Sequence, residues 1–305
     1  MIDTAISLAS IYIFILIGYF AKFFLKNRLD EKTLILISIY VLQPFLTFWG
    51  LLKKEIDLDL IYTPLFFIII SIIMIFINFL LAKRFFEDKK DRSIFIIAGI
   101  IGNTGNLGIP LGIAIFGEVS IPYTTIINLA NVFVVYTFGV YFYSRGNFDI
   151  KNSLLNIIKL PILWFAILAI IVNLANIRFH PSILKSLEMG AYASIVLQLM
   201  IFGIYLYSVK VKELNLKLLL SVNLIKFVFL PFVAFFIIKL LPIEPLSKGI
   251  LFAEIVMPLA VTNVNLSALY NCKPKDVTAA VFTTSLLFLG LVFIYIPFIQ
   301  NLIKS

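Results

Sequence analysis

Two segments of this 305-residue chain place asparagine, glycine and proline inside runs that are otherwise apolar. The first segment reads SIFIIAGIIGNTGNLGIPLGIAIFG and covers residues 93–117. Its polar and flexible residues fall together near the middle: Gly102, Asn103, Gly105, Asn106, Gly108 and Pro110. Proline removes one helical hydrogen bond and costs about 3 kcal/mol in a helix interior. The pattern therefore predicts a helix that is broken at Pro110.

The second segment repeats this pattern in the other half of the chain. It reads AEIVMPLAVTNVNLSALY, covers residues 253–270, and contains Pro258, Asn263 and Asn265. Pro258 follows Pro110 by 148 residues. The same shift lays the first apolar run roughly over the sixth and the fifth over the tenth. We interpret the two segments as corresponding elements of an internal repeat.

The chemistry that two such segments predict is the binding of an anion without a buried cation. A helix that begins inside the protein has unpaired N–H groups and about half a positive charge at its N-terminus. Two such ends that meet form an anion site, and asparagine amides add donors and acceptors that orient a carboxylate. An alternative stays open: glycines at spacings of three and four allow close helix packing, with asparagine as an interhelical hydrogen-bonding group.

Catalytic and metal-binding chemistry find little support in the sequence. His180 is the only histidine and Cys272 the only cysteine, so neither a Ser-His-Asp relay nor a Cys/His metal cluster is predicted. We expect no enzyme activity, no cofactor and no metal. Two ionisable residues stand out in apolar runs, because charges at membrane depth are costly and are often functional. These are Lys226 and Glu254, one turn before Pro258, and both are candidates for coupling transport to an ion.

The elements that position these residues are predicted to be membrane-spanning helices. The chain is 62% hydrophobic and 13% charged, whereas soluble domains are about 25% charged. In lipid, every backbone N–H and C=O group must find its hydrogen-bond partner within the protein. Long apolar runs therefore form helices of roughly 20 residues. Ten are predicted in one domain, residues 1–305: Thr4–Phe24, Thr33–Leu52, Leu60–Ala82, Ser93–Phe116, Ile121–Tyr143, Ile157–Ile177, Ser182–Tyr207, Lys217–Leu241, Gly249–Tyr270 and Val277–Gln300.

The distribution of basic residues predicts the orientation. Most of the 25 Lys and Arg residues lie in the connections after the first, third, fifth, seventh and ninth predicted helices. Because basic loops remain in the cytoplasm, both termini are expected outside the plasma membrane. Ten helices divide into five and five, and an odd number per half inverts the second half. We therefore expect an inverted repeat, with halves at about residues 1–145 and 155–305.

At this point the sequence resembles a known family. The run GNTGNLGIPLGIAIFG resembles the auxin efflux carrier family, which includes the plant PIN-formed auxin transporters and bacterial malate permease-like proteins. MPLAVTNVNLSALYNCKPKDV and FTTSLLFLG are similar to the ninth and tenth helices of that family, and YVLQPFLTFWGLL to its second. The similarity covers essentially the whole chain.

The resemblance implies a fold and a set of site residues. It implies an all-α membrane fold of ten helices in two inverted five-helix repeats, with helices 4 and 9 broken at prolines and crossing, as in bile-acid sodium symporter-like proteins. Pro110 and Pro258 would mark the crossing, and Asn103 would line the site. Asn131 falls where plant members carry a glutamine that faces the substrate. We add Asn106, Asn263 and Asn265 for their positions alone.

These observations predict a secondary transporter for a small organic anion that works by an elevator-like motion. Two alternatives stay open: a sodium-coupled symporter of the bile-acid type, and a membrane receptor that binds a ligand without moving it. The expected partners are the organic anion and the lipid bilayer. The resemblance also implies a homodimer, and nothing in the sequence predicts nucleic-acid binding.

Overall fold

The computed structural model describes residues 2–144, 155, 157–208 and 215–304. The described chain is helical, and its only extended pairing is an isolated antiparallel bridge between Gly102 and Leu259. The longer helices have these bounds: α1 Ile2–Leu25, α2 Glu31–Ile37, α3 Gln43–Leu51, α4 Leu58–Phe85, α5 Lys89–Ile97, α6 Ile109–Phe116, α7 Ile121–Val134, α8 Val140–Tyr143, α10 Pro161–Leu174, α11 Pro181–Ser208, α12 Leu216–Leu224, α13 Leu230–Lys239, α14 Pro245–Ile255, α15 Thr262–Leu269 and α16 Pro274–Lys304.

Short 3₁₀ or π-helical turns connect several of these helices: η1 Lys26–Arg28, η2 Ser38–Leu42, η3 Thr104–Gly108, η4 Glu118–Ser120, η5 Val135–Gly139 and η6 Ile225–Phe229. The turn η2 joins α2 to α3, η5 joins α7 to α8, and η6 joins α12 to α13 into continuous helical segments. Polar side chains define where helices begin. Asp57 accepts the N–H of Leu60 at the start of α4, and Asn215 accepts that of Leu218 at the start of α12.

Six helical segments in the described chain are long and apolar enough to cross a membrane: Glu31–Leu51, Leu58–Phe85, Glu118–Tyr143, Pro181–Tyr207, Leu216–Lys239 and Pro274–Lys304. Three shorter apolar helices accompany them: Ala9–Leu25, Thr104–Phe116 and Pro161–Leu174. The chain is therefore an all-helical protein with several membrane-spanning helices. The number ten and the inverted repeat stay predictions.

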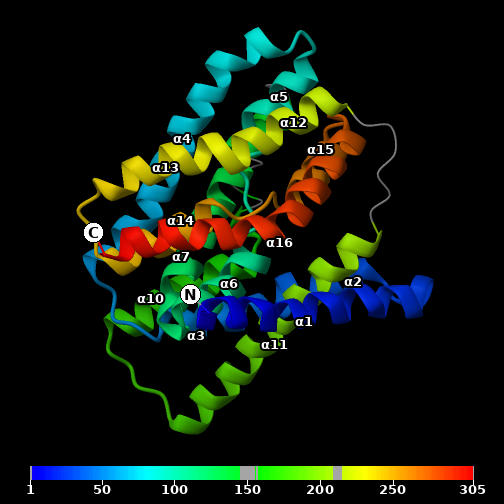
Figure 1. Ribbon diagram of the computed structural model, residues 1–305. Coiled ribbons are helices and arrows are strands. Elements are labelled where there is room, and N and C mark those ends of the chain that lie inside the picture. Colours follow the sequence, from blue (N-terminus) through cyan, green and yellow to red (C-terminus); the bar gives the residue numbers. More distant parts are fainter. Residues whose placement is uncertain (1, 145–154, 156, 209–214, 305) are drawn as a thin grey trace.

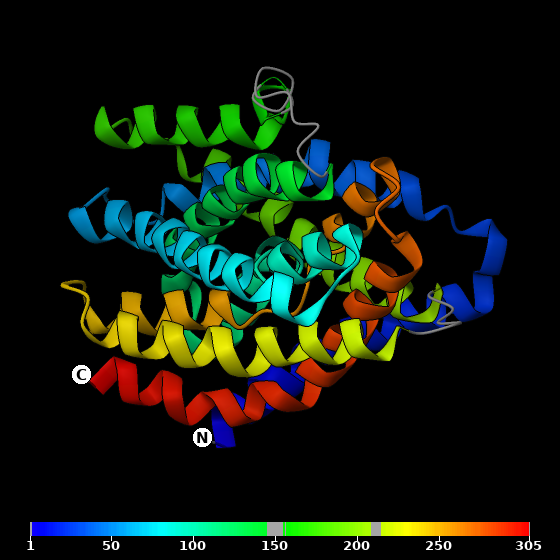
Figure 2. The same cartoon turned by 90° about the horizontal axis from the view of Figure 1, so that it is seen from above.

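Helix α1 packs along α11 at one side of the molecule, with α4 on the other side (Figure 1). Glycines allow the close approach, because a Cβ on Gly18 would overlap the backbone of Met200, and one on Gly203 would overlap that of Ile15. Figure 2 shows both termini toward the same end of the molecule. The core between these helices contains α14, α16 and the segments that build the site described next.

Candidate functional site

Two interruptions of helical structure meet in the interior of the molecule. One covers residues 98–103, between α5 and η3, and the other covers residues 256–261, between α14 and α15. The N–H of Asn103 donates to the Pro258 carbonyl at 2.8 Å, and that of Ala260 donates to the Ile101 carbonyl at 3.0 Å. The two segments therefore lie antiparallel and satisfy part of each other's backbone, which an interrupted helix at membrane depth requires.

The first interruption differs in position from the predicted break at Pro110. Pro110 is the second residue of α6, which continues the turn η3, and the interruption ends seven residues earlier, at Asn103. Proline is tolerated in membrane helices where local π-helical adjustments accommodate it, and η3 lies just before Pro110. Pro258 lies inside the second interruption, where its carbonyl accepts the N–H of Asn103. The proline thus coincides with the break in only one of the two segments.

A cavity of about 200 Å³ lies against the crossing. Among the described residues no Asp, Glu, Lys, Arg or His lines it, and its polar groups are amides, hydroxyls and backbone. The lining residues are Ile39, Tyr40, Gln43, Gly102, Asn103, Thr104, Gly105, Asn106, Asn128, Asn131, Val132, Val135, Tyr136, Leu160, Ile162, Ala260 and Thr262. The first three residues of η3, Thr104, Gly105 and Asn106, line it, so the cavity adjoins the beginning of a helix that runs on through α6.

Asn103 and Asn131 supply the open hydrogen-bonding positions of this cavity. Asn103 is 4% exposed, and its Nδ2 has no partner among the described residues. Asn131 donates from Nδ2 to the Gly102 carbonyl at 2.8 Å and to Thr104 Oγ1 at 3.0 Å, which leaves its Oδ1 without a partner. A buried polar atom without a partner is costly, so these atoms are positions where a bound molecule gains hydrogen bonds.

Several lining residues were not identified in the sequence. Thr104 donates to Asn128 Oδ1 at 3.0 Å and thereby joins η3 to α7. Gln43 donates to Asn106 Oδ1 at 3.3 Å and joins α3 to η3. Gln43 could have been found as the one amide side chain in the apolar run YVLQPFLTFWGLL. Asn128 carries a weaker signal, since it stands one turn before Asn131 on the same helix.

The asparagines of the second segment do not line the cavity. Asn263 is fully buried and donates from Nδ2 to the carbonyls of Ile101 and Ala260, each at 3.0 Å. Its Oδ1 accepts the hydroxyl of Tyr143 at 2.9 Å. Asn265 is exposed on α15. Of the residues proposed from the sequence, the structure brings Asn103, Asn106 and Asn131 together in the cavity.

The two candidate coupling residues lie beside the crossing and outside the cavity lining. Lys226 is 0% exposed in η6, and Glu254 is 1% exposed in the last turn of α14. Lys226 Nζ donates to the carbonyl of Ile255 at 2.9 Å. No group of three or more His, Cys, Asp or Glu residues in the described chain could hold a metal ion.

The cavity extends from the crossing toward the start of α10, where Leu160 and Ile162 line it. Polar contacts join helices at the opposite end of the molecule. Lys53, which follows α3, forms an ion pair with Glu118 of η4. Tyr192 of α11 also donates to Glu118, and Lys54 hydrogen-bonds to Tyr123 of α7. These contacts connect α3 and α11 to the η4–α7 segment near the end of α10, where Asn173 Nδ2 donates to the carbonyls of Leu51 and Lys54.

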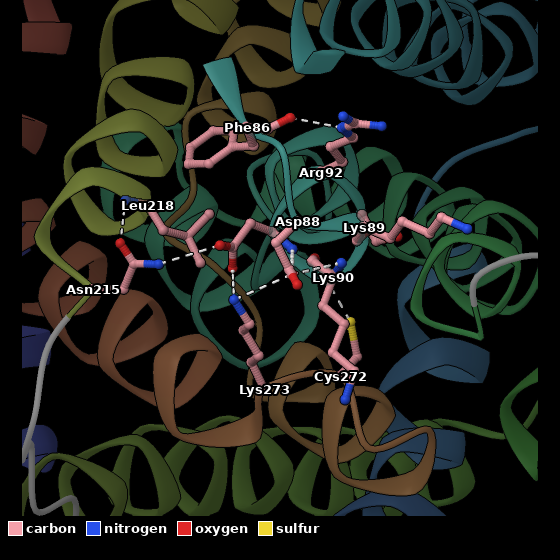
Figure 3. Close-up of polar contacts among 11 residues, drawn as sticks. Phe86, Asp88, Lys89, Lys90, Arg92, Asn215, Leu218, Cys272 and Lys273 are labelled. Atoms are coloured by element: carbon pink, nitrogen blue, oxygen red, sulfur yellow. Dashed lines mark hydrogen bonds and ion pairs between the residues drawn. The ribbon is translucent and has the colours of Figure 1, made fainter. Parts of the chain in front are cut away.

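A second polar cluster joins the ends of three other elements (Figure 3). Lys273, in the turn before α16, contacts Asp91 of α5 at 2.5 Å and Asp88 at 3.2 Å. Asn215 at the start of α12 donates to Asp91 Oδ2 at 3.4 Å. The hydrogen bond from the backbone N–H of Asp91 is the main cause that lowers the pKa of Asp88, and the contact with Lys273 lowers this pKa further. Burial alone lowers the pKa of Lys273, but its contacts with Asp91 and Asp88 outweigh burial and raise it.

The fold and the site together define an integral membrane protein with a polar cavity between helices. The sequence profile of a family described as membrane transport protein matches residues 4–296. An uncharacterized transporter of Methanocaldococcus jannaschii is 30% identical over 285 residues, which is 90% of this chain and 92% of that protein. The chain belongs to this membrane transport family, the auxin efflux carrier family indicated by its motifs. It is a membrane transporter and not a member of an enzyme class.

Proposed function

We propose that the protein is a secondary transporter for a small organic anion, a mono- or dicarboxylate, which binds in the cavity at the crossing. The observation that carries this proposal is the unpartnered Nδ2 of Asn103 beside the first turn of η3. The turn continues into α6, so its first N–H groups lie at the N-terminus of a helix of 13 residues, Thr104–Phe116. An amide donor and a helix N-terminus together favour a carboxylate group.

The chemistry of the cavity supports a small and partly apolar anion. Its volume of about 200 Å³ suits a molecule of a few carbons, and Tyr40, Val132 and Tyr136 add apolar surface. Because no charged side chain lines the cavity, the anion would be held by dipoles and hydrogen bonds. Such contacts bind an anion weakly enough for it to be released on the other side of the membrane.

Alternating access is supported by the difference between the two ends of the molecule. The cavity extends toward the start of α10, and the contacts of Lys53 and Lys54 with the η4–α7 segment lie at the other end. In our proposal these contacts break when the crossing segments move past α3 and α11 in an elevator-like motion. The two crossing segments pair in antiparallel fashion, in keeping with an inverted repeat. We further propose a plasma-membrane location with both termini outside.

Counterflow in proteoliposomes tests the proposal. Vesicles loaded with unlabelled acetate, lactate, benzoate, malate or succinate should take up the same labelled compound when it is transported. We expect counterflow for at least one of these carboxylates and its loss in Asn103→Ala. Asn265→Ala is the matched control, because Asn265 is exposed on α15 and lies outside the cavity lining.

The same assay separates the alternatives. Stimulation by an imposed sodium gradient would favour a symporter of the bile-acid type. Saturable binding of a carboxylate with no counterflow would favour a receptor. Counterflow that survives in Asn103→Ala at the wild-type rate would remove the proposed site.

A further inference from the structure

Two ionisable side chains lie fully buried beside the crossing and are not explained by anion binding in the cavity. Lys226 belongs to η6 within the span Leu216–Lys239, and Glu254 to α14. Charged side chains are costly at the centre of a bilayer and are usually functional there. The charges of Lys226 and Glu254 must therefore be balanced, either by each other or by a bound ion.

Lys226 occupies a position that suits a cation. Its Nζ donates at 2.9 Å to the carbonyl of Ile255, the last residue of α14. Carbonyls at a helix C-terminus lack intrahelical partners and carry partial negative charge. A Cβ placed on Gly102 would lie 3.4 Å from Nζ, so the ammonium group also adjoins the first interruption. The side chain thus holds a positive charge between the two crossing segments.

Glu254 is in contact with the other side of the same crossing. A Cβ on Gly108 would overlap its carboxyl group, so the carboxyl lies directly against η3. Its Oε2 is buried and has no hydrogen-bond partner among the described residues. A buried carboxylate oxygen that lacks a donor is a position where a proton relieves the cost of the charge. The segment that touches Glu254 also carries Thr104, Gly105 and Asn106 of the cavity.

Beside Lys226 and Glu254, the neighbouring elements carry further titratable groups. From α16, the Tyr295 hydroxyl approaches this region, and it donates to the carbonyl of Phe227. On α14 itself, Lys248 lies two turns away and donates to the carbonyl of Lys239. The elements η3 and α6 present Gly108 and apolar residues to Glu254.

We propose that Lys226 is a built-in cation of the transport site and that Glu254 binds the coupling proton, so that one proton moves with each organic monoanion. This proposal rests on the proposed function. With Glu254 ionised, the pair is neutral and an anion would leave one uncompensated negative charge in the membrane. When Glu254 takes a proton from water on the loading side, the charge of Lys226 balances the anion. Release of the proton on the other side restores the neutral pair, and no sodium ion is needed.

The first test needs no substrate. Infrared difference spectra of the protein in lipid, recorded across about pH 5 to 9, where buried carboxyl groups titrate, should show the C=O band of a protonated carboxyl. The band should be missing in Glu254→Gln and present in Glu87→Gln, a control in the exposed loop after α4. In Lys226→Met the carboxyl should keep its proton over the whole range. A wild-type protein with no Glu254 band would overturn the proposal.

The second test measures coupling with labelled lactate, benzoate and malate. A pH gradient of one unit should drive up to about tenfold accumulation of the monoanions in wild-type vesicles, and a sodium gradient should drive none. Glu254→Gln should keep counterflow and lose this accumulation. Wild-type accumulation in Glu254→Gln, or accumulation driven by sodium, would contradict the proposal. Absence of wild-type counterflow with every carboxylate would instead refute the proposed function, while the infrared titration would still decide whether Glu254 binds a proton.

Discussion

The two interrupted segments carry similar residues but use them differently. In the first, Asn103 lines the cavity and its Nδ2 has no partner among the described residues, and Asn106 accepts a hydrogen bond from Gln43. In the second, both Nδ2 and Oδ1 of Asn263 form hydrogen bonds to groups of the protein, and Asn265 is exposed. Similar residues in the two segments therefore have different partners. The first segment leaves an amide without a partner among the described residues, and the second joins the crossing through Asn263.

The largest effect that would sharpen this contrast is expected from Asn263→Ala. The change removes the Nδ2 bonds to the carbonyls of Ile101 and Ala260, which keep their backbone N–H partners, and takes the acceptor from the Tyr143 hydroxyl. Since a typical hydrogen bond contributes about 1 kcal/mol and an unsatisfied buried group costs about 1–3 kcal/mol, we expect a loss of a few kcal/mol in stability. Thermal unfolding in detergent measures it. Tyr143→Phe keeps both Nδ2 bonds and should lose less. An unchanged melting temperature in Asn263→Ala would remove the structural role.

Asn103→Ala should show the opposite behaviour, with a large effect on transport and a small one on stability. The backbone N–H of Asn103 keeps its bond to Pro258, and its Nδ2 has no protein partner to lose. Loss of a hydrogen bond to a charged group costs about 1.5–3 kcal/mol, which corresponds to about a 10- to 100-fold loss of affinity. Concentration dependence of carboxylate uptake gives this value. A strongly lowered melting temperature with unchanged affinity would reverse the comparison.

Gly105→Ala tests the contact between the first segment and Asn128 of α7. A Cβ at this position would lie 2.8 Å from Asn128 Oδ1, so Asn128 must shift and its bond from Thr104 is disturbed. Overpacking of this kind costs about 1–3 kcal/mol. We expect reduced carboxylate uptake and a moderately lower melting temperature. Gly290→Ala in α16 is the matched control, because its Cβ would meet no atom within 4 Å. Equal behaviour of the two variants would show that the Gly105 contact is unimportant.

The smallest effect is expected at the cluster of Figure 3, away from both interruptions. Lys273→Ala removes ion pairs that are partly exposed, and such pairs contribute about 0.2–1 kcal/mol and weaken with salt. Because the pKa of Asp88 is lowered in the folded protein, its stabilising effect is present at neutral pH. It is lost as the pH falls from about 4 through the folded-state value. The difference in melting temperature between variant and wild type should shrink there. A difference that is unaffected by salt and acid would point to packing instead.

Residue types and hydropathy predicted much of this molecule correctly. Apolar runs such as residues 60–82 and 277–300 have no other stable form in lipid than a helix, and α4 and α16 cover them. The motif around Asn103 indicated the family, which the comparisons confirm. The position of the first break was predicted less well. Proline alone does not mark a break: Pro110 follows the π-helical turn η3 and the helix continues through it, as α4 and α16 continue through Pro64 and Pro297.

Membrane embedding and family membership were determined by the sequence itself, because they depend on composition and on a local motif that each residue carries wherever the chain folds. The roles of individual asparagines were decided by the tertiary structure alone. An asparagine binds a ligand or stabilises the fold according to which donors and acceptors surround it. For Asn103, Asn131 and Asn263 those neighbours come from elements far apart in the chain, such as Pro258, Gly102 and Tyr143.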